Sequence, residues 1–271
     1  MQKIKFYCVT NKKIDFLNSK FLNEESFRFC WVGKDKAPKN YLTCDTGDNI
    51  YHKEKFYSEL TFHYWYWKNL LHLEDNNQWI GFCQKRRFWV NTNEVLGINK
   101  LNLNEYLIKW AANDWENFDA ILCSPISVRS PKKIKMIKRG WKNILKDPTI
   151  LFDKKKQNLS LHFDMHHGYN NLNKAIDKLD EKNKEDFKIF VREKNIFNPH
   201  IMFIAKPATI NLWFEDLFNW LDKCEGEFDL EKLDGYDTGR LFAYLSERYL
   251  SYWFKKYCKC TEKNWVQLDN F

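Results

Sequence analysis

Apolar and polar residues follow two recurring patterns along this chain. Short runs rich in β-branched and aromatic residues predict strands at 3–10, 26–33, 79–83, 118–128 and 199–207. Longer stretches with apolar residues every three or four positions predict helices at 56–71, 171–191, 210–225 and 239–257. Because strands and helices alternate, we expect an α/β fold with a mainly parallel, Rossmann-like central sheet flanked by helices.

Neither an internal repeat nor a low-complexity linker interrupts the 271 residues. A chain of this length can form one large α/β domain with a sizeable core. We therefore expect a single domain over residues 1–271, with the last two helices packed on it.

The chain is basic, with a net charge of +8, and 44% of its residues are hydrophobic. A globular protein of this charge favours an anionic partner, namely a nucleotide, a phosphate group, a nucleic acid or an acidic membrane surface. The most basic segment, 130–146, is a candidate for contact with an anionic membrane.

Several sequence features bear on where the protein works. No signal peptide opens the chain, and no apolar run reaches the length of about 18 residues that a membrane span needs. The eight cysteines include no CxxC pair, so neither a zinc framework nor a disulfide lattice is indicated. We expect a reduced, cytoplasmic protein whose membrane contact, if it has any, is peripheral at the inner membrane face.

The stretch QWIGFCQKRRFWV (78–90) joins a buried strand to a cluster of cations, Lys85, Arg86 and Arg87. In α/β sheets, ligands bind beyond the carboxyl ends of the strands. Arginine forks suit phosphate, and adjacent cations suit a diphosphate. A solvated charge run is the alternative, and the spacing alone leaves both open.

A second candidate is the stretch CDTGDNI (44–50), in which Asp45 and Asp48 flank Gly47. Such a loop can bind a divalent metal, hydrogen-bond a sugar hydroxyl or only cap the following turn. The helix that follows carries Glu59 and Lys68. Because these residue types are seldom buried without a partner, we expect both to be largely buried and to hold the helix structurally.

A third candidate is LHFDMHHGYNN (161–171), which contains Asp164, His166 and His167. A metal site, an acid–base pair and plain hydrogen bonding all fit these residues. Adjacent histidines on a helix cannot both face one metal, so the metal interpretation requires a loop here. Further on, Arg240, Glu247 and Arg248 lie within about two helical turns, where an internal ion-pair network is an alternative to a functional site.

The chain lacks the short motifs of several large enzyme classes. It contains no GxGxxG, GxxxxGK[ST], HExxH or GxSxG sequence. This absence weighs against dinucleotide-binding dehydrogenases, P-loop NTPases, zinc proteases and α/β-hydrolases.

Five motifs follow one another along the chain: DTGDNI (45–50), YSELTFHYWYWKN (57–69), WIGFCQKRRFW (79–89), IMFI (201–204) and YLSERYL (244–250). In this order they resemble a bacterial family of glycosyltransferases, of the domain-of-unknown-function type, found in capsular and surface-polysaccharide clusters. The resemblance covers about residues 44–255, and the YWYWKN block is its most specific part. Gln84-Lys85 stands where that family usually has a histidine, and Ile201 stands where it has an asparagine.

The resemblance implies a GT-A-like fold, a nucleotide-diphosphate sugar donor, and transfer to a growing capsular polysaccharide or lipopolysaccharide, with galactofuranose among the sugars. Donor binding is then expected in residues 1–128 and binding of a glycan or lipid-linked glycan acceptor in residues 129–271. The expected donor-binding residues are Thr10, Lys12, Asp45, Asp48, Asn49, Lys85, Arg86 and Arg87. The expected catalytic residues are Asp164, His167 and Glu247, and the expected acceptor-side residues are His166, His200 and Arg240.

Two views of metal dependence follow from these candidates. Asp45 and Asp48 are the residues that would hold Mg²⁺ or Mn²⁺. Alternatively, Lys85, Arg86 and Arg87 replace the metal by neutralising the donor diphosphate, which is the interpretation that we favour.

Two other classes of function remain open at the level of sequence. One is a noncatalytic module that binds glycan or nucleic acid, which the basic charge and the abundant aromatic residues allow. No nucleic-acid-binding signature is present, so we do not expect a nucleic-acid partner. The other class is a sugar-phosphate transferase, which would share the anion site.

Overall fold

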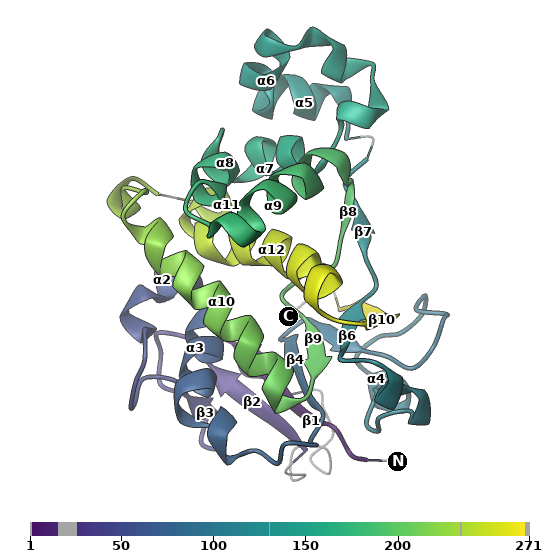
Figure 1. Cartoon of the computed structure of the whole chain (residues 1–271). Helices are drawn as coiled ribbons and strands as arrows, with labels where there is room; N and C mark the ends of the chain where they lie inside the picture. The colour runs from purple at the N-terminus through teal and green to yellow at the C-terminus, as the bar shows by residue number, and fades with distance from the viewer. Residues whose placement is uncertain (1, 16–25, 130, 234, 269–271) are drawn as a thin grey trace. The chain divides into compact units, whose positions relative to one another are not determined.

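The computed structural model describes residues 2–15, 26–129, 131–233 and 235–268 (Figure 1). The chain divides into two compact units, each built from separate stretches of sequence. Unit 1 comprises Met1–Ser124, His200–Glu215 and Trp253–Phe271, and unit 2 comprises Pro125–Pro199 and Asp216–Tyr252. The expectation of a single domain stays a prediction, and each unit is described by itself.

Unit 1 is built on a mixed, mostly parallel sheet. Its strands in the described part of the chain are β1 (Lys5–Thr10), β2 (Phe27–Trp31), β3 (Leu42–Thr43), β4 (Ile80–Gln84), β5 (Arg87–Trp89), β6 (Ala120–Cys123), β9 (Phe203–Ala205), β10 (Cys260–Lys263) and β11 (Trp265–Gln267). The main path runs in the order β10-β6-β9-β4-β1-β2-β3. Strand β9 is antiparallel to both neighbours, whereas the other pairs on this path are parallel.

The central strands are apolar on both sides because both faces of the sheet are covered. Tyr7 and Phe82 point to one face, where they pack against Tyr66 of helix α3 (Leu60–Asn69). The ring centroids of Tyr7 and Phe82 lie 4.7 and 5.3 Å from that of Tyr66. On β1, Phe6 and Cys8 belong instead to a second apolar cluster, as the period of two requires. This confirms the predicted α/β fold with a mainly parallel sheet flanked by helices.

In the described part of the chain, the other helices that lie wholly within unit 1 are short. They are α2 (Glu54–Tyr57), α4 (Leu103–Tyr106) and the 3-10 helices η1 (Tyr51–Lys53), η2 (Leu71–Leu73) and η3 (Asn113–Asn117). The helix predicted over 56–71 is therefore two helices, α2 and α3. They are separated at Ser58, whose φ of 52° cannot continue a right-handed helix.

Unit 2 is mainly helical. It contains α5 (Lys133–Arg139), α6 (Trp141–Lys146), α7 (Leu159–His167), α8 (Asn171–Ile176), α9 (Glu181–Glu193), α11 (Tyr236–Gly239) and the 3-10 helices η4 (Pro148–Leu151), η5 (Lys154–Lys156) and η6 (Leu230–Lys232). Strands β7 (Ile126–Ser127) and β8 (Ile196–Phe197) form a small antiparallel pair. The long helices α10 (Pro207–Glu225) and α12 (Leu241–Tyr257) contribute residues to both units.

Two predicted elements of this region are each divided in two. The strand predicted over 118–128 separates into β6 and β7 at Pro125, which has no N–H group to continue a ladder. The helix predicted over 171–191 separates into α8 and α9, because Asp180 has an extended backbone with ψ of 147°. Within the described ranges, no helix is long and apolar enough to cross a membrane.

Candidate functional site

One edge of the unit 1 sheet gathers the carboxyl ends of four parallel strands. The register pairs Thr10 with Trp31 and Val9 with Gln84, and it pairs Trp31 with Thr43. Strands β1, β2, β3 and β4 therefore end side by side. This is the edge at which ligands bind in open α/β sheets.

The predicted cation cluster lies at this edge, where Lys85 and Arg86 form the tight turn between β4 and β5 and Arg87 begins β5. Lys85 continues the ladder, with its backbone N–H donating to the carbonyl of Val9 at 3.0 Å. Its ammonium group donates to Oδ1 of Asn11, just beyond the end of β1. Arg87 donates from Nη1 to Oε1 of Gln84 at 2.7 Å. The strand end thus fixes two of the three cations through neutral amide partners.

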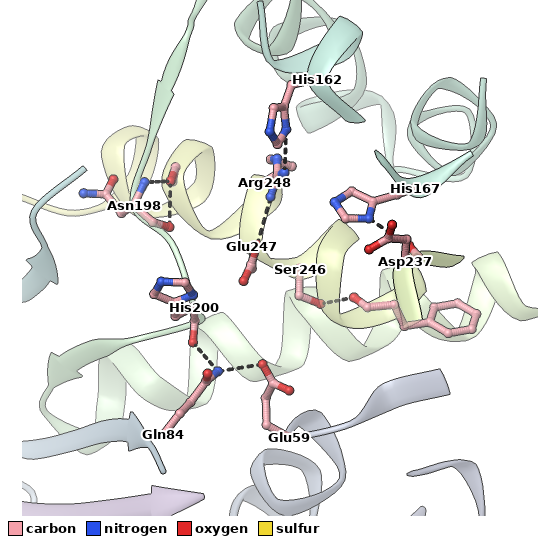
Figure 2. Close-up of polar contacts among 12 residues, drawn as sticks. Glu59, Gln84, His162, His167, Asn198, His200, Asp237, Ser246, Glu247 and Arg248 are labelled. Atoms are coloured by element: carbon pink, nitrogen blue, oxygen red, sulfur yellow. Dashed lines mark hydrogen bonds and ion pairs between the residues drawn. The ribbon is translucent and has the colours of Figure 1, made fainter. Parts of the chain in front are cut away.

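Gln84 is the centre of a polar network that sequence reasoning did not predict (Figure 2). Its Nε2 donates to Oε1 of Glu59 at 2.6 Å and to the carbonyl of His200 at 2.7 Å. Since its Oε1 accepts from Arg87, one amide links an anion, a cation and a backbone carbonyl. No signal in the sequence pairs these residues, because 25 and 116 positions separate Gln84 from Glu59 and His200.

The two backbone segments that supply the partners of Gln84 are strained. Ser58, directly before Glu59, has φ of 52° and is buried. His200 and Ile201 have φ values of 72° and 52° in succession, and positive φ is a rare conformation for a β-branched residue such as Ile201. Strain of this kind costs roughly 1–3 kcal/mol per residue and concentrates at functional sites. The strained segments deliver the Glu59 carboxylate and the His200 carbonyl to Gln84.

The loop 44–50, called here the aspartate loop, is held by α3. Asn69 donates from Nδ2 to the carbonyl of Asp48 at 2.8 Å and accepts the N–H of the same residue at 3.2 Å. Trp65 donates from Nε1 to the carbonyl of Thr46 at 2.8 Å. Gly47 faces Asn69 with φ of +59°, and a Cβ there would lie 2.2 Å from Oδ1 of Asn69. The YWYWKN block therefore shapes this loop.

The two loop carboxylates are exposed, and Oδ1 of Asp48 accepts the Tyr64 hydroxyl at 3.2 Å. Asn49 caps the next turn by accepting the N–H of Tyr51 at 3.1 Å. Among the described residues, no three His, Cys, Asp or Glu side chains are grouped to hold a metal ion. Asp45 and Asp48 would thus hold a Mg²⁺ or Mn²⁺ ion only together with other oxygen ligands, such as water or the donor phosphates.

The remaining predicted residues of unit 1 differ in their accessibility. Thr10 is buried, and its hydroxyl bonds the backbone of Lys12, donating to the carbonyl at 2.6 Å and accepting from the N–H at 3.0 Å. Lys12 itself is exposed. Thr10 therefore shapes the turn after β1 from which Lys12 projects.

The expectation that Glu59 and Lys68 are largely buried is wrong for Lys68. Lys68 is exposed, and its ammonium group lies 3.5 Å from the centroid of the Trp67 ring. The helix has enough aromatic surface to carry the lysine stem, so burial of the charge is unnecessary. Glu59 is half-buried and engaged with Gln84.

In unit 2, Asp164, His166 and His167 lie within helix α7 and not in a loop. A helix excludes the geometry in which His166 and His167 share one metal, and the described residues contain no group of three His, Cys, Asp or Glu side chains that could hold a metal here. Asp164 is buried, and desolvation raises the pKa of its carboxyl group. Its oxygens accept hydrogen bonds from Nδ2 of Asn143 at 2.7 Å and from the N–H of Asn170 at 2.9 Å. These contacts hold the carboxylate within unit 2 and do not test its predicted catalytic role.

The two histidines at the end of α7 also have protein partners. His167 stacks on Tyr244 with ring centroids 3.7 Å apart, and its Nδ1 lies 2.9 Å from the carbonyl of Asp237 (Figure 2). Burial lowers the pKa of His167 to about 3. His166 Nδ1 lies 2.9 Å from Nη1 of Arg139. These contacts do not test the predicted catalytic and acceptor roles.

Helix α12 carries an ion pair between neighbours in sequence (Figure 2). Arg248 is 1% exposed, and its Nη1 donates to Oε2 of Glu247 at 2.9 Å. Its Nη2 lies 3.2 Å from Nδ1 of His162, and its guanidinium covers the Phe197 ring at 3.9 Å. Burial and the Arg248 charge lower the pKa of His162 to about 2, so a neutral ring accepts the bond. Arg240 is half-buried at the end of α11.

Comparison with known proteins places the chain in a family. The model of the family described as "Domain of unknown function (DUF4422)" matches residues 5–259. The chain belongs to this family. The DUF4422 match spans both units, including the carboxyl edge of β1–β4 and the Glu247–Arg248 pair. A search of curated proteins gives no match.

The fold of this chain is similar to that of a solved structure. The apo structure of the bifunctional glycosyltransferase WbbM matches with a TM-score of 0.68 at 20% sequence identity. The match covers 99% of this chain and 46% of the WbbM chain, so the chain spans about half the length of that protein. At this identity the likeness establishes a shared α/β fold.

Proposed function

We propose that this protein is a glycosyltransferase that moves a sugar from a nucleotide-diphosphate donor to a growing surface glycan, either capsular polysaccharide or lipopolysaccharide. The observation that carries the proposal is the cation cluster Lys85–Arg87 at the carboxyl edge of the sheet, in which Asn11 holds Lys85 and Gln84 holds Arg87. The fold shared with WbbM supports the same class of reaction.

The cations at this edge match the charge of a donor. Lys85, Arg86 and Arg87 offer three positive charges, against the two to three negative charges of a diphosphate. Their attraction to the phosphate oxygens grows as the glycosidic bond breaks and negative charge develops on the leaving group. Lys12, Asp45, Asp48 and Asn49 lie on the neighbouring loops of the same edge and are assigned to donor hydroxyl groups, or to a metal if one is bound. A bound Mg²⁺ or Mn²⁺ would add positive charge at the diphosphate.

For the acceptor we assign Glu247 as the base. The Glu247 carboxylate is fixed by Arg248, and its side chain is 14% exposed. Asp164 and His167 are buried and form hydrogen bonds within the protein. Glu247 takes the proton from an acceptor hydroxyl while that oxygen forms a bond to the anomeric carbon. The bond from the anomeric carbon to the diphosphate breaks, and the nucleoside diphosphate leaves with the electron pair. His166, His200 and Arg240 remain candidates for contacts with the acceptor.

Calorimetric titration with uridine and guanosine diphosphates tests the donor site. Replacing both Arg86 and Arg87 by Ala should lower the affinity for the more tightly bound nucleotide by at least tenfold. The reason is that each charge-assisted contact contributes roughly 1.5–3 kcal/mol. Arg28→Ala is the matched control, since Arg28 is an exposed arginine at the amino end of β2. We expect nucleotide binding to persist in EDTA, because the cation cluster supplies the positive charge.

Four outcomes would contradict these assignments. Unchanged nucleotide affinity in a folded double variant would remove Arg86 and Arg87 from the donor site. A large gain with Mn²⁺ that Asp48→Asn abolishes would assign the diphosphate to a metal. A response to polynucleotides alone would favour a noncatalytic module. In assays with nucleotide sugars, release of nucleoside monophosphate in place of diphosphate would indicate sugar-phosphate transfer.

A further inference from the structure

The segment 131–156 of unit 2, called here the basic segment, contains helices α5 and α6 and the 3-10 helices η4 and η5. It holds ten Lys and Arg residues and two Asp residues, a net charge of +8. The whole chain has 44 Lys and Arg residues and 36 Asp and Glu residues, which is also +8. The positive and negative residues outside the segment therefore cancel, and the excess charge of the protein lies in this one region.

The inner side of the basic segment already has its core. Met136 of α5 and Ile150 of η4 pack in a small cluster with Leu161 and Met165 of α7, and Ile144 of α6 lies against it. This cluster attaches both short helices to α7. The segment needs no further apolar residues to stay folded on unit 2.

The outer side nevertheless carries large apolar side chains. On α5, Ile134 and Ile137 are 68% and 54% exposed, and on α6, Trp141 and Leu145 are 52% and 74% exposed. Phe152, which follows η4, is 76% exposed. Spacings of three and four residues place each helical pair on one helix face. Large exposed apolar residues that recur within one short stretch indicate an interaction surface.

Lysines accompany these apolar side chains. The Lys133 ammonium lies 5.1 Å from the centroid of the Phe152 ring, and the Lys142 ammonium lies 5.6 Å from that of Trp141. Short amphipathic helices with Lys and Arg beside Trp, Phe and Leu are typical of segments that lie in the membrane interface. The aliphatic stems of the Lys and Arg side chains lie along apolar surface, while their charged groups contact lipid phosphates.

We propose that the outer face of the basic segment binds an anionic lipid bilayer, with Ile134, Ile137, Trp141, Leu145 and Phe152 entering the interface and the surrounding lysines contacting the lipid head groups. A nucleic acid would use the lysines but would leave the aliphatic side chains in water. An acidic peptide would have to match five apolar groups dispersed among cations. A bilayer accommodates both the exposed apolar side chains and the surrounding lysines. The inference does not depend on the proposed transfer reaction.

Flotation of the full chain with vesicles tests this inference. We expect binding to vesicles that mix phosphatidylcholine with phosphatidylglycerol, and much weaker binding to phosphatidylcholine alone. The substitutions Trp141→Ser and Leu145→Ser together should reduce partitioning by at least roughly tenfold, because the apolar area can no longer be buried. Leu96→Ser with Leu101→Ser is the matched control, since these leucines are 88% and 94% exposed in unit 1.

A second pair of variants separates charge from apolar insertion. Exchanging Lys135, Lys138 and Lys142 for Gln should lower binding about a hundredfold at low salt, with a smaller effect at high salt. The control exchanges Lys34, Lys36 and Lys39, three exposed lysines of unit 1. Melting curves should be unchanged in every variant, because the substituted side chains are exposed.

The inference fails if the protein floats with neither vesicle. It also fails if the control variants lose as much binding as the segment variants. Binding of a single-stranded oligonucleotide that depends on these lysines, without vesicle binding, would assign the face to nucleic acid. Self-association in sedimentation that the Trp141 and Leu145 substitutions abolish, without vesicle binding, would assign it to a second copy of the chain.

Discussion

A neutral residue, Gln84, links two charged residues at the candidate donor site, Glu59 and Arg87. An amide can donate to the Glu59 carboxylate and accept from the Arg87 guanidinium at the same time. Gln84 thereby supplies each charged group with a polar partner. The Gln84 amide joins Arg87 to Glu59 without itself neutralising the guanidinium charge, as a direct ion pair with Glu59 would.

We predict that Gln84→Leu weakens nucleoside-diphosphate affinity by about tenfold, because losing one hydrogen bond to a charged group costs roughly 1.5–3 kcal/mol, only part of which is passed to the ligand. In an Arg87→Ala background the same change should have little further effect. Calorimetric titration of both single variants and of the double variant gives the coupling directly.

Gln78→Leu is the control for this prediction. Gln78 lies just before β4 and donates to the carbonyls of Lys3 and Trp79. Its loss should lower stability without changing nucleotide affinity. Additive losses from Gln84→Leu and Arg87→Ala would show that Gln84 does not act through Arg87.

At the scale of elements, α3 determines the shape of the aspartate loop. The side chains of Trp65 and Asn69 bond its backbone, and Gly47 allows the close approach. The loop is therefore ordered by the helix that follows it, and Asp45 and Asp48 are presented at the sheet edge as exposed carboxylates.

We predict that Gly47→Ala destabilises the protein more than Gly97→Ala. Both glycines have positive φ, +59° and +88°, so each substitution carries a backbone cost of about 1–2 kcal/mol. At Gly47 the added Cβ also meets Oδ1 of Asn69, whereas at Gly97 nothing lies within 4 Å. Urea denaturation measures the two free energies of unfolding, and equal losses would show that the contact with Asn69 adjusts freely.

At the scale of the whole molecule, buried histidines connect stability to pH. The His63 ring packs against the rings of Phe82 and Phe214, with centroid distances of 4.8 and 5.7 Å. Neither of its ring nitrogens makes a hydrogen bond. Burial lowers the pKa of His63 to about 3. His162 and His167 have pKa values of about 2 and 3 for the same principal reason.

These depressed pKa values set the direction of the pH effect. In the unfolded chain each histidine gains a proton near its ordinary pKa of about 6.5, while the folded protein keeps the rings neutral. Because the unfolded state binds more protons below this pH, the free energy of unfolding should fall as the pH drops from about 6.5 towards 3.

We predict that His63→Phe reduces this acid sensitivity by up to about 1.4 kcal/mol per pH unit, the contribution of one proton. Phenylalanine suits the aromatic site, so the folded variant is expected. Denaturation curves between pH 7 and about pH 4 give the slope. His72→Phe is the control, since His72 is exposed, and an unaltered slope in His63→Phe would mean that the ring is protonated in the folded protein.

The sequence alone predicted the alternation of strands and helices, the two long helices α10 and α12, and the position of the cation cluster. Apolar runs such as 79–83 are local features, and a strand buried on both faces needs them regardless of its partners. The strong periodicity of α10 and α12 likewise predicts those helices from neighbouring residues. Since a parallel strand places its carboxyl end at a known edge, the location of Lys85–Arg87 also follows from the sequence.

The tertiary structure alone decided which side chains meet. The Gln84 amide contacts residues 25 and 116 positions away, and only the strand order and the strained backbone at Ser58 and His200 bring them together. The expectation that Lys68 is buried with a partner was also wrong, because an exposed lysine can lie on the aromatic surface of its own helix. Residue patterns report local preference, whereas polar partners depend on three-dimensional distances that the chain topology sets.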